Sequence, residues 1–369
     1  MSKPFDVCIR GDGVVGRTLA LLLARERLRV ALVARPEREP ALQATADVRA
    51  YALNSASRQV LTALRTWPEP PFCTPVTEMQ VWGDDHTRLE FTAHQADQPA
   101  LAWIVDVPAL EQQLVQAVRY QPQIETVQAP VEAALHVICE GHKSSSREEF
   151  GVTWRVRPYP QIAIAARLMS DKPHGGVARQ WFSKGNVLAL LPLLGADGHA
   201  VALVWSVSVE RAGSLEKMLP AEFCVALQDV CGQEAGELQL TGERASWPLA
   251  LSNAEHWVGD GWALAGDAAH TVHPLAGQGL NLGLADAACL TKVIAEREYW
   301  RGLGDIRLLR RYERARKADV AAMEVVTDGL HGIFAQTDTR WQALRSWGMQ
   351  GFERSGPLKS WVMRQAIGS

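Results

Sequence analysis

The first residues whose types and spacing suggest chemistry are three glycines near the N-terminus. The segment Gly11-Asp12-Gly13-Val14-Val15-Gly16 has the pattern G-x-G-x-x-G. Between a strand and a helix, the first glycine permits a tight turn, the second lets the backbone approach a pyrophosphate, and the third lets helix and strand pack closely. The N–H groups and positive dipole of the helix start attract phosphates. The motif predicts a dinucleotide site that includes Gly11, Gly13, Val14, Val15 and Gly16.

The elements around this motif are the ones that it needs. Apolar patterning predicts a strand over residues 5–10, a helix over about 15–26 and a second strand over 28–33. Strand, turn, helix and strand make a βαβ unit and therefore a parallel sheet. The acid that usually ends the second strand and binds ribose is replaced by Ala34. Arg35 beside it could meet adenine or a phosphate, or it could be a solvated loop residue.

A longer motif lies in residues 264–286, which read LAGDAAHTVHPLAGQGLNLGLAD. A strand over 261–265 ends at Gly266-Asp267, so the Asp267 carboxylate can reach a ligand hydroxyl at the carboxyl edge of the sheet. Pro274 fixes a turn, and a helix begins at about residue 277. Its first N–H groups have no partner within the helix and face whatever lies above them.

This longer motif resembles the flavin-binding segment of class A FAD-dependent aromatic monooxygenases, most of all the branch that hydroxylates ubiquinone precursors. In that family the Gly-Asp segment binds the ribityl chain of FAD, and the turn that follows lies against the isoalloxazine. The resemblance implies FAD contacts from Gly266, Asp267, Pro274, Gly277, Gln278, Gly279, Leu280 and Asn281.

Other segments resemble the same branch, so that the resemblance covers nearly the whole chain. In the segment from residue 47 to Trp67 a family arginine contacts the cofactor, and that arginine corresponds to Arg49. The alternative for Arg49 is an ordinary salt bridge. Residues 189–206 resemble the substrate-domain sheet, and residues 308–323 resemble the C-terminal helix.

A third family motif, Asp-Gly with a downstream Ser and Arg, contacts both the flavin and the nicotinamide cofactor. The corresponding segment, residues 139–147, has Glu140 in place of the Asp and Arg147 as the arginine. Relatives insert a small β-meander just before this motif. Between Gln121 and Cys139 we expect hardly enough room for two strands.

His270 and His273 invite a metal or acid–base interpretation. No third ligand with suitable spacing is near, and the surrounding glycines favour a flavin wall, so we predict no metal site. No G-x-S-x-G segment or Ser-His-Asp arrangement is recognisable. The flavin would carry the chemistry and need no conventional catalytic side chain, so we nominate none.

Composition excludes some functions. The 369-residue chain has a net charge of -3 and no basic stripe, which argues against nucleic-acid binding. Its six cysteines are scattered without a C-x-x-C pair, which is typical of buried thiols in a reducing compartment. Neither a secretory signal nor a membrane-spanning stretch is recognisable, so we expect a cytoplasmic protein.

These patterns predict an α/β fold. A Rossmann-type FAD-binding domain with a parallel sheet would be interleaved with an antiparallel-sheet substrate domain and followed by C-terminal helices. We expect strands over 78–92 and 161–209, helices over 55–64 and 107–118, and an irregular stretch over 67–75. The expected FAD-binding domain comprises 1–70, 100–155 and 250–300, the substrate domain 71–99 and 156–249, and the C-terminal helical region 301–369.

The resemblance implies an FAD-dependent monooxygenase that uses NAD(P)H and O2 to hydroxylate the ring of a polyprenylated phenol in ubiquinone biosynthesis. The tail implies an apolar groove and peripheral contact with a membrane. Ala34, Glu140 and the short 121–139 region favour an alternative: a flavin-weak or non-catalytic homologue that acts as a partner subunit. An enzyme for a soluble aromatic substrate stays open as a third interpretation. Whether the chain forms a homo-oligomer or a ubiquinone-pathway complex is also open.

Overall fold

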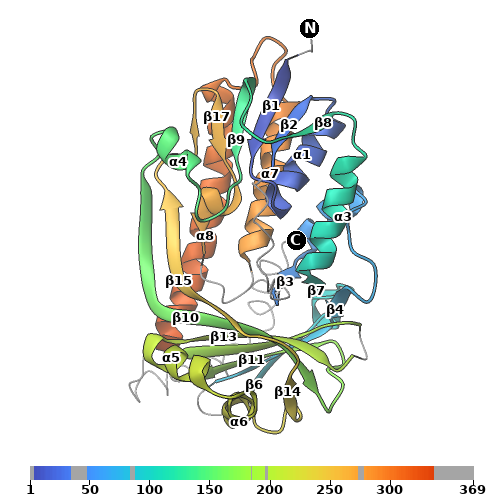
Figure 1. Ribbon diagram of the computed structural model, residues 1–369, viewed down its shortest axis with the longest axis vertical. Coiled ribbons are helices and arrows are strands. Elements are labelled where there is room, and N and C mark those ends of the chain that lie inside the picture. The colour runs from blue at the N-terminus through green and yellow to red at the C-terminus, as the bar shows by residue number, and fades with distance from the viewer. Residues whose placement is uncertain are drawn as a thin grey trace.

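The N-terminal βαβ unit forms the centre of a parallel sheet in a computed structural model of the chain (Figure 1). The structure describes residues 4–34, 48–83, 88–183, 185–195, 198–272 and 278–335. The order of this sheet is β16 (Val258–Gly259), β17 (Trp262–Leu264), β9 (Ala133–Ile138), β1 (Phe5–Arg10), β2 (Val30–Val33) and β8 (Ile124–Val127). All neighbours pair in parallel except β16 and β17.

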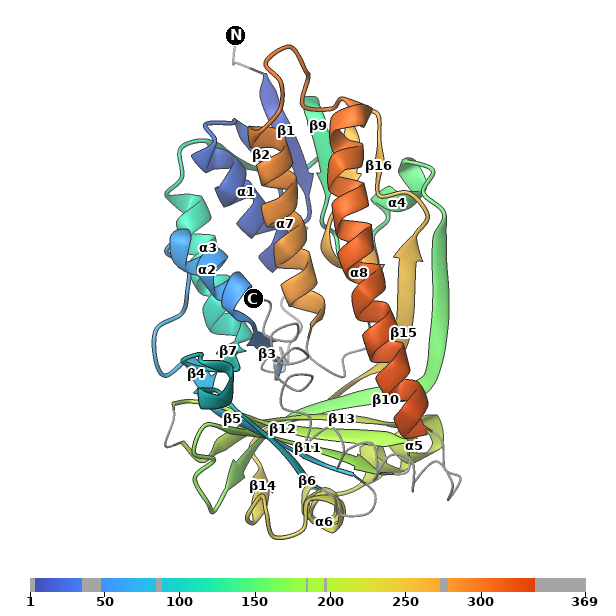
Figure 2. The ribbon, with the colours of Figure 1, turned by 180° about the vertical axis from the view of Figure 1, so that it is seen from behind.

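Helices cover one face of the parallel sheet, as Figure 2 shows. They are α1 (Val14–Arg25), α3 (Val107–Arg119), α7 (Gly279–Ala295) and α8 (Ile306–Ala335), with α2 (Ser55–Ala63) packed on α7. α1 and α8 both pack against α7. Their buried apolar side chains form one core with Val7, Ile9 and Val137 of the sheet, because strand residues two apart share a face.

A larger, mostly antiparallel sheet lies across the other end of the molecule (Figure 1). Its strands, in spatial order, are β18 (His270–Thr271), β15 (Ala245–Ala254), β10 (Trp154–Ser170), β13 (Ala200–Ser208), β12 (Asn186–Pro192), β11 (Val177–Ser183), β5 (Glu78–Trp82) and β6 (Arg88–Thr92), and β14 (Leu238–Leu240) pairs with β10. The helices α5 (Val209–Lys217) and α6 (Pro220–Cys231) cover its underside (Figure 2). β10 has 17 residues and runs from the parallel-sheet half into this sheet.

A small sheet and three short helices complete the fold. The small sheet has the order β3 (Ala50–Leu53), β7 (Ala102–Asp106) and β4 (Cys73–Val76). The short helices are η1 (His94–Ala96), α4 (Ser146–Glu149) and η2 (Gly266–Ala268). Side chains of the small sheet pack on one part of the upper face of the large sheet. None of the helices among the described residues has both the length and the apolar character needed to span a membrane.

The α/β fold, the βαβ unit, the helices near residues 55 and 107, and the antiparallel strands are confirmed. Two local expectations were wrong. The stretch expected to be irregular ends in a strand, because Cys73 to Val76 pair with β7. The 121–139 region holds two strands, β8 and β9, and both join the parallel sheet. The helices α5 and α6 were not predicted.

Candidate cofactor site

The predicted motifs leave the parallel sheet at one edge, side by side. Arg10, the last residue of β1, pairs with Val33 of β2 and with Ile138 of β9. Ile138 pairs in turn with Leu264, the last residue of β17. Because the strands are parallel and end in register, Gly11, Ala34, Cys139 and Ala265 follow them at the same carboxyl edge. In open α/β sheets ligands bind at this edge.

The three glycines of the first motif have different surroundings. Gly11 has φ +107°, and a Cβ added there would lie 2.5 Å from the carbonyl oxygen of Cys139. A Cβ on Gly16 would lie 1.9 Å from the carbonyl oxygen of Gly11. A Cβ on Gly13 would meet no atom within 4 Å. The first and third glycines are therefore required by protein packing, whereas the second faces open space at the helix start.

The starts of α1 and α7 lie next to each other. A Cβ on Gly283 of α7 would lie 2.7 Å from a methyl group of Val15, and one on Gly266 would lie 3.3 Å from the same side chain. Gly283 is four residues into α7, which is about 6 Å along a helix. The start of α7 therefore lies roughly one helical turn from its contact with α1, and both helices begin on the same side of the sheet (Figure 1).

Both helix starts suit an anion. Neither Gly13, the N-cap of α1, nor Gln278, the N-cap of α7, makes a side-chain capping hydrogen bond, and neither first turn contains an acidic residue. A Cβ on Gly279 would also meet nothing within 4 Å. The first N–H groups of a helix need outside partners, and the helix dipole favours negative charge there. The arrangement therefore fits the pyrophosphate of a dinucleotide.

Asp267 lies at the same edge. Its residue is exposed, yet desolvation by the surrounding protein raises the pKa of its carboxyl above the ordinary value. The positive charges of His270, His142 and Arg49 lower this pKa in part. An exposed carboxylate at this edge can accept hydrogen bonds from ligand hydroxyls.

Arg49 is exposed and lies near Asp267, since its charge acts on the Asp267 carboxyl. Its guanidinium donates to the Tyr51 hydroxyl at 3.4 Å, and its carbonyl accepts from Arg167 at 3.5 Å. Arg167 itself pairs with Asp106 at 2.6 Å. The predicted contact of Arg49 with a cofactor stays a prediction, and its position near Asp267 agrees with it.

Asn281 is buried and is engaged with the protein. Its side-chain amide donates to the carbonyl of Ala52 at 2.8 Å, and its side-chain oxygen accepts from the Asn54 backbone N–H at 2.9 Å and from the Ser57 hydroxyl at 2.7 Å. These bonds fasten the end of β3 and the start of α2 to the start of α7. By these bonds Asn281 positions the segment that carries Arg49.

The remaining predicted contacts fall into two groups. Val14 is buried, Leu280 packs against the core of the parallel-sheet half, and Gln278 stands before the first residue of α7. Arg35, His273, Pro274 and Gly277 lie outside the described residues. Among the described residues, no cluster of His, Cys, Asp and Glu could hold a metal ion.

Glu140 is used inside the protein. Its carboxylate accepts hydrogen bonds from the Ser144 hydroxyl at 2.7 Å, and from the Ser146 hydroxyl and backbone N–H at 2.7 and 3.1 Å. Arg147 is buried; it donates to the carbonyls of Gly141, His142 and Ala268 and stacks over Trp154 at 3.8 Å. The third motif therefore shapes the turn over residues 140–147, and Arg147 ties it to the Gly266–His270 turn.

Sequence reasoning missed a buried charge cluster beneath Asp267. Asp286 is fully buried and contacts Gly266, His270 and Arg316. The available signal was Asp286 as the single acidic residue of the mostly apolar helix 279–295. Its partners come from separate segments, so their meeting could not be read from spacing.

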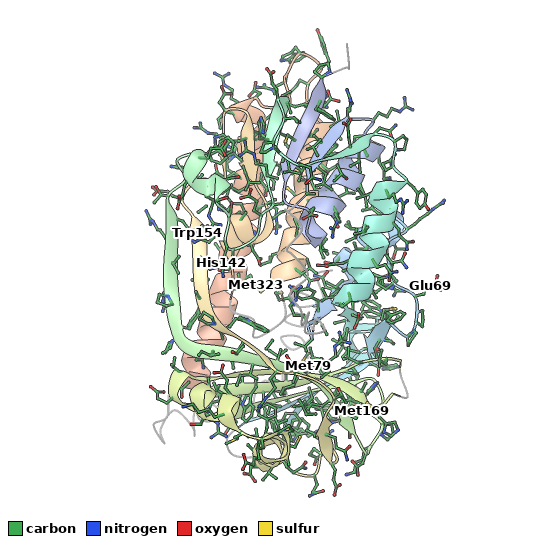
Figure 3. The ribbon with its side chains drawn as sticks, in the orientation of Figure 1. Glu69, Met79, His142, Trp154, Met169 and Met323 are labelled. Atoms are coloured by element: carbon green, nitrogen blue, oxygen red, sulfur yellow. The ribbon has the colours of Figure 1, made fainter. Side chains whose placement is uncertain are left out.

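The large sheet presents small apolar side chains toward this edge. Trp205, Leu203 and Ile164 point down into the core with α5 and α6. Alternate residues therefore point to the other face, toward the parallel-sheet half. The apolar ones include Ala163, Ala165, Ala189 and Val204, with Ala178 and Ala202 under the small sheet, and the polar Arg167, Gln180 and Ser206 share this face. Figure 3 shows Met79 on the large sheet, with His142 and Trp154, whose rings lie 6.2 Å apart, in the half above it.

Comparison with known proteins agrees with this site. The family model described as FAD binding domain matches residues 103–327, which is more than half of the chain. Ubiquinone hydroxylase UbiL of Rhodospirillum rubrum is 31% identical over 100% of this chain and 90% of that protein. The 3-demethoxyubiquinol 3-hydroxylase of Escherichia coli is 28% identical over 100% of this chain and 99% of that protein.

Solved structures share the fold. The crystal structure of PqsL from Pseudomonas aeruginosa has a TM-score of 0.77 and 20% identity, and the match covers 94% of this chain and 100% of that one. The p-nitrophenol 4-monooxygenase PnpA from Pseudomonas putida has a TM-score of 0.75 and 15% identity, over 100% of this chain and 99% of that one. The parallel sheet, its helices and the crossing antiparallel sheet are thus an arrangement that this chain shares with these solved structures.

Proposed function

This chain belongs to the FAD-binding domain family, in the group that contains the ubiquinone hydroxylases, and from that premise we propose that it hydroxylates the aromatic ring of a polyprenylated phenol in ubiquinone biosynthesis. Bound FAD, reduced by NAD(P)H, would activate O2 for this reaction. The single observation that carries the proposal is the junction of two uncapped helix starts with Asp267 at one sheet edge.

The chain's own residues would do three things for the cofactor. The starts of α1 and α7, near Gly13 and Gly279, would bind its pyrophosphate and its ring end with backbone N–H groups. Asp267 would accept hydrogen bonds from the ribityl hydroxyls, and Arg49 would add positive charge nearby. The other predicted cofactor contacts, including Arg35, Pro274 and Gly277, are part of the same proposal.

The substrate side of the proposal rests on the relatives and on the large sheet. The two relatives described above, which match over the full chain, are named for hydroxylation of ubiquinone or a ubiquinol. The small apolar side chains of β10, β12 and β13 would exclude water from the ring and leave room for a tail. A site that excludes water also protects reactive intermediates from hydrolysis. We assign no acid–base role to a side chain.

The same proposal includes the division of the chain. The cofactor domain would comprise 1–70, 100–155 and 250–300, and the substrate domain 71–99 and 156–249, with the C-terminal region after residue 300. A prenyl tail would bring the protein to a membrane surface as a peripheral protein. The relatives' names favour the enzyme over a non-catalytic partner subunit.

The test begins with the visible spectrum of the purified protein. We expect bound flavin, and NAD(P)H oxidation that a prenylated phenol stimulates with formation of the hydroxylated product. The same phenol without its tail should give a higher KM. A protein that binds no FAD, even when apoprotein is titrated with it, would refute the proposal and leave the partner-subunit interpretation. Equal KM values with and without the tail would refute the apolar groove alone.

A further inference from the structure

Asp286 reaches the Gly266–His270 turn at both of its ends. One carboxylate oxygen accepts from the Gly266 backbone N–H at 2.9 Å and from the Nε2 of His270 at 2.7 Å. Gly266 has φ +63°, and Asp267 follows it directly. The conformation of the backbone that carries Asp267 is therefore fixed at its entry and at its exit by one side chain of α7.

The other carboxylate oxygen of Asp286 accepts from the Nε of Arg316 at 2.7 Å, and Arg316 also donates to the carbonyl of Leu282 at 3.3 Å. Burial alone would raise the pKa of the Asp286 carboxyl, but His270 and Arg316 outweigh burial and hold that pKa below its ordinary value. The carboxylate is therefore ionised and can only accept, so the Nε2 of His270 carries the hydrogen. A stacked Trp257 ring, 4.7 Å away, holds the imidazole in place.

None of these side chains can touch a ligand directly. Asp286 is 0% exposed, His270 1% and Arg316 5%. Arg147 adds a further restraint, because it donates to the Ala268 carbonyl in the middle of the turn at 3.2 Å. The cluster therefore acts on a cofactor through the turn that it holds, and not by direct contact.

We propose that Asp286, with His270 and Arg316, is a positioning cluster that sets the Gly266–His270 turn for FAD before FAD binds. It rests on the proposed function in taking FAD as the ligand. Gly283, one turn before Asp286 on the same helix, packs on Val15 and on Gly266. One face of α7 thus sets the distance to α1 and the shape of the turn, which are the parts that would grip the cofactor.

The test compares two replacements of one residue. His270→Leu removes the donor to Asp286, whereas His270→Gln places an amide N–H at similar reach. Positioning predicts that His270→Leu weakens FAD binding by about tenfold, equivalent to about 1.4 kcal/mol, and that His270→Gln restores most of it. Titration of apoprotein with FAD, followed by flavin fluorescence, measures the Kd. Equal Kd values for both variants would refute positioning.

Tyr312→Phe is the matched control. The buried Tyr312 hydroxyl of α8 donates to the Leu264 carbonyl at 2.8 Å, in the same core but before the turn. Its removal should lower the Tm of the apoprotein and leave the Kd for FAD unchanged. A Kd that rises as much in Tyr312→Phe as in His270→Leu would show a general stability effect and overturn the proposal.

Hydrogen exchange of the wild-type apoprotein tests the proposal without any variant. If the turn is set in advance, the Gly266 amide, which donates to Asp286, should be protected before FAD is added. Free exchange in the apoprotein, with protection only after FAD binds, would overturn the inference. Failure of the wild-type protein to bind FAD would instead overturn the proposed function.

Discussion

The different surroundings of Gly13 and Gly16 lead to a prediction that separates folding from cofactor binding. An added methyl group at Gly13 meets no protein atom within 4 Å, whereas at Gly16 it would lie 1.9 Å from the Gly11 carbonyl oxygen. Gly13→Ala should therefore leave the apoprotein as stable as the wild type, or stabilise it by up to about 1 kcal/mol through the unfolded chain. Gly16→Ala should destabilise it by about 1–3 kcal/mol or more, because backbone must move.

Gly13→Ala, which should not destabilise the apoprotein, should nevertheless weaken FAD binding. If a phosphate approaches the backbone at Gly13, the methyl group displaces it and costs about one charge-assisted hydrogen bond, about 1.5–3 kcal/mol. The Kd of Gly13→Ala should then rise roughly ten- to a hundredfold. Urea unfolding of the apoprotein and fluorescence titration with FAD measure the two effects.

Gly213→Ala is the control, because Gly213 lies in α5 on the underside of the large sheet and also has nothing within 4 Å of an added Cβ. It should change neither the Kd nor the fold. A wild-type Kd in Gly13→Ala would refute the assignment of the α1 start to the cofactor. Loss of stability in Gly13→Ala would refute the geometry itself.

Three further predictions follow from single groups. Because protein desolvation raises the pKa of the Asp267 carboxyl, Asp267→Asn should stabilise the apoprotein at pH 7 and weaken FAD binding. The gain in stability should fade as the pH falls through the raised pKa and vanish below 3.8, the pKa in the unfolded chain, which unfolding experiments from pH 3 to 8 would measure. Glu140→Ala removes an acceptor of three hydrogen bonds and should cost about 2–4 kcal/mol in urea unfolding, with no loss expected at a remote exposed acid such as Glu26. Burial raises the pKa of the Cys231 thiol to about 12, so a thiol reagent at pH 8 should label the half-buried Cys224 of the same helix first. Peptide mapping would measure the labelling rates of the two cysteines, and equal rates would contradict this prediction.

The sequence predicted those parts of the fold that depend on neighbours in the chain. The unit around Gly11 to Gly16 is local: the strand, the turn and the helix each have their own signal within thirty-odd residues. The order of the strands was not predictable in the same way. β8 and β9 are close in sequence, yet they lie on opposite sides of β1 and β2, because pairing is decided by burial across the sheet.

The helices α5 and α6 were missed although α6 has a recognisable start. Pro220 is the first residue of α6, and the Leu219 backbone N–H donates to the Glu222 side chain at 2.9 Å. Proline in the first turn and an acid three residues after the cap are typical helix-start signals. These signals lie between two strand-like apolar runs, which dominate the pattern of this part of the chain.

Glu140 shows why a family motif predicts less at a single position than it does over a whole segment. From the sequence, Glu in place of Asp indicated an altered cofactor contact. The longer side chain instead turns to Ser144 and Ser146 and shapes its own turn. The choice between ligand and protein depends on hydroxyl groups whose orientation no spacing rule fixes. The departure at Glu140 is therefore weak evidence against flavin binding.

The stronger evidence about function lies in the residues that do not face the ligand. Asn281 fastens the Arg49 segment, Arg147 fastens the Ala268 carbonyl, and Asp286 fastens Gly266. Each places a buried polar side chain on backbone at the same sheet edge, and burying such groups is costly unless their bonds are complete. These bonds hold the turns at the sheet edge in fixed conformations, which agrees with a working flavin site even where single facing residues depart from the family pattern.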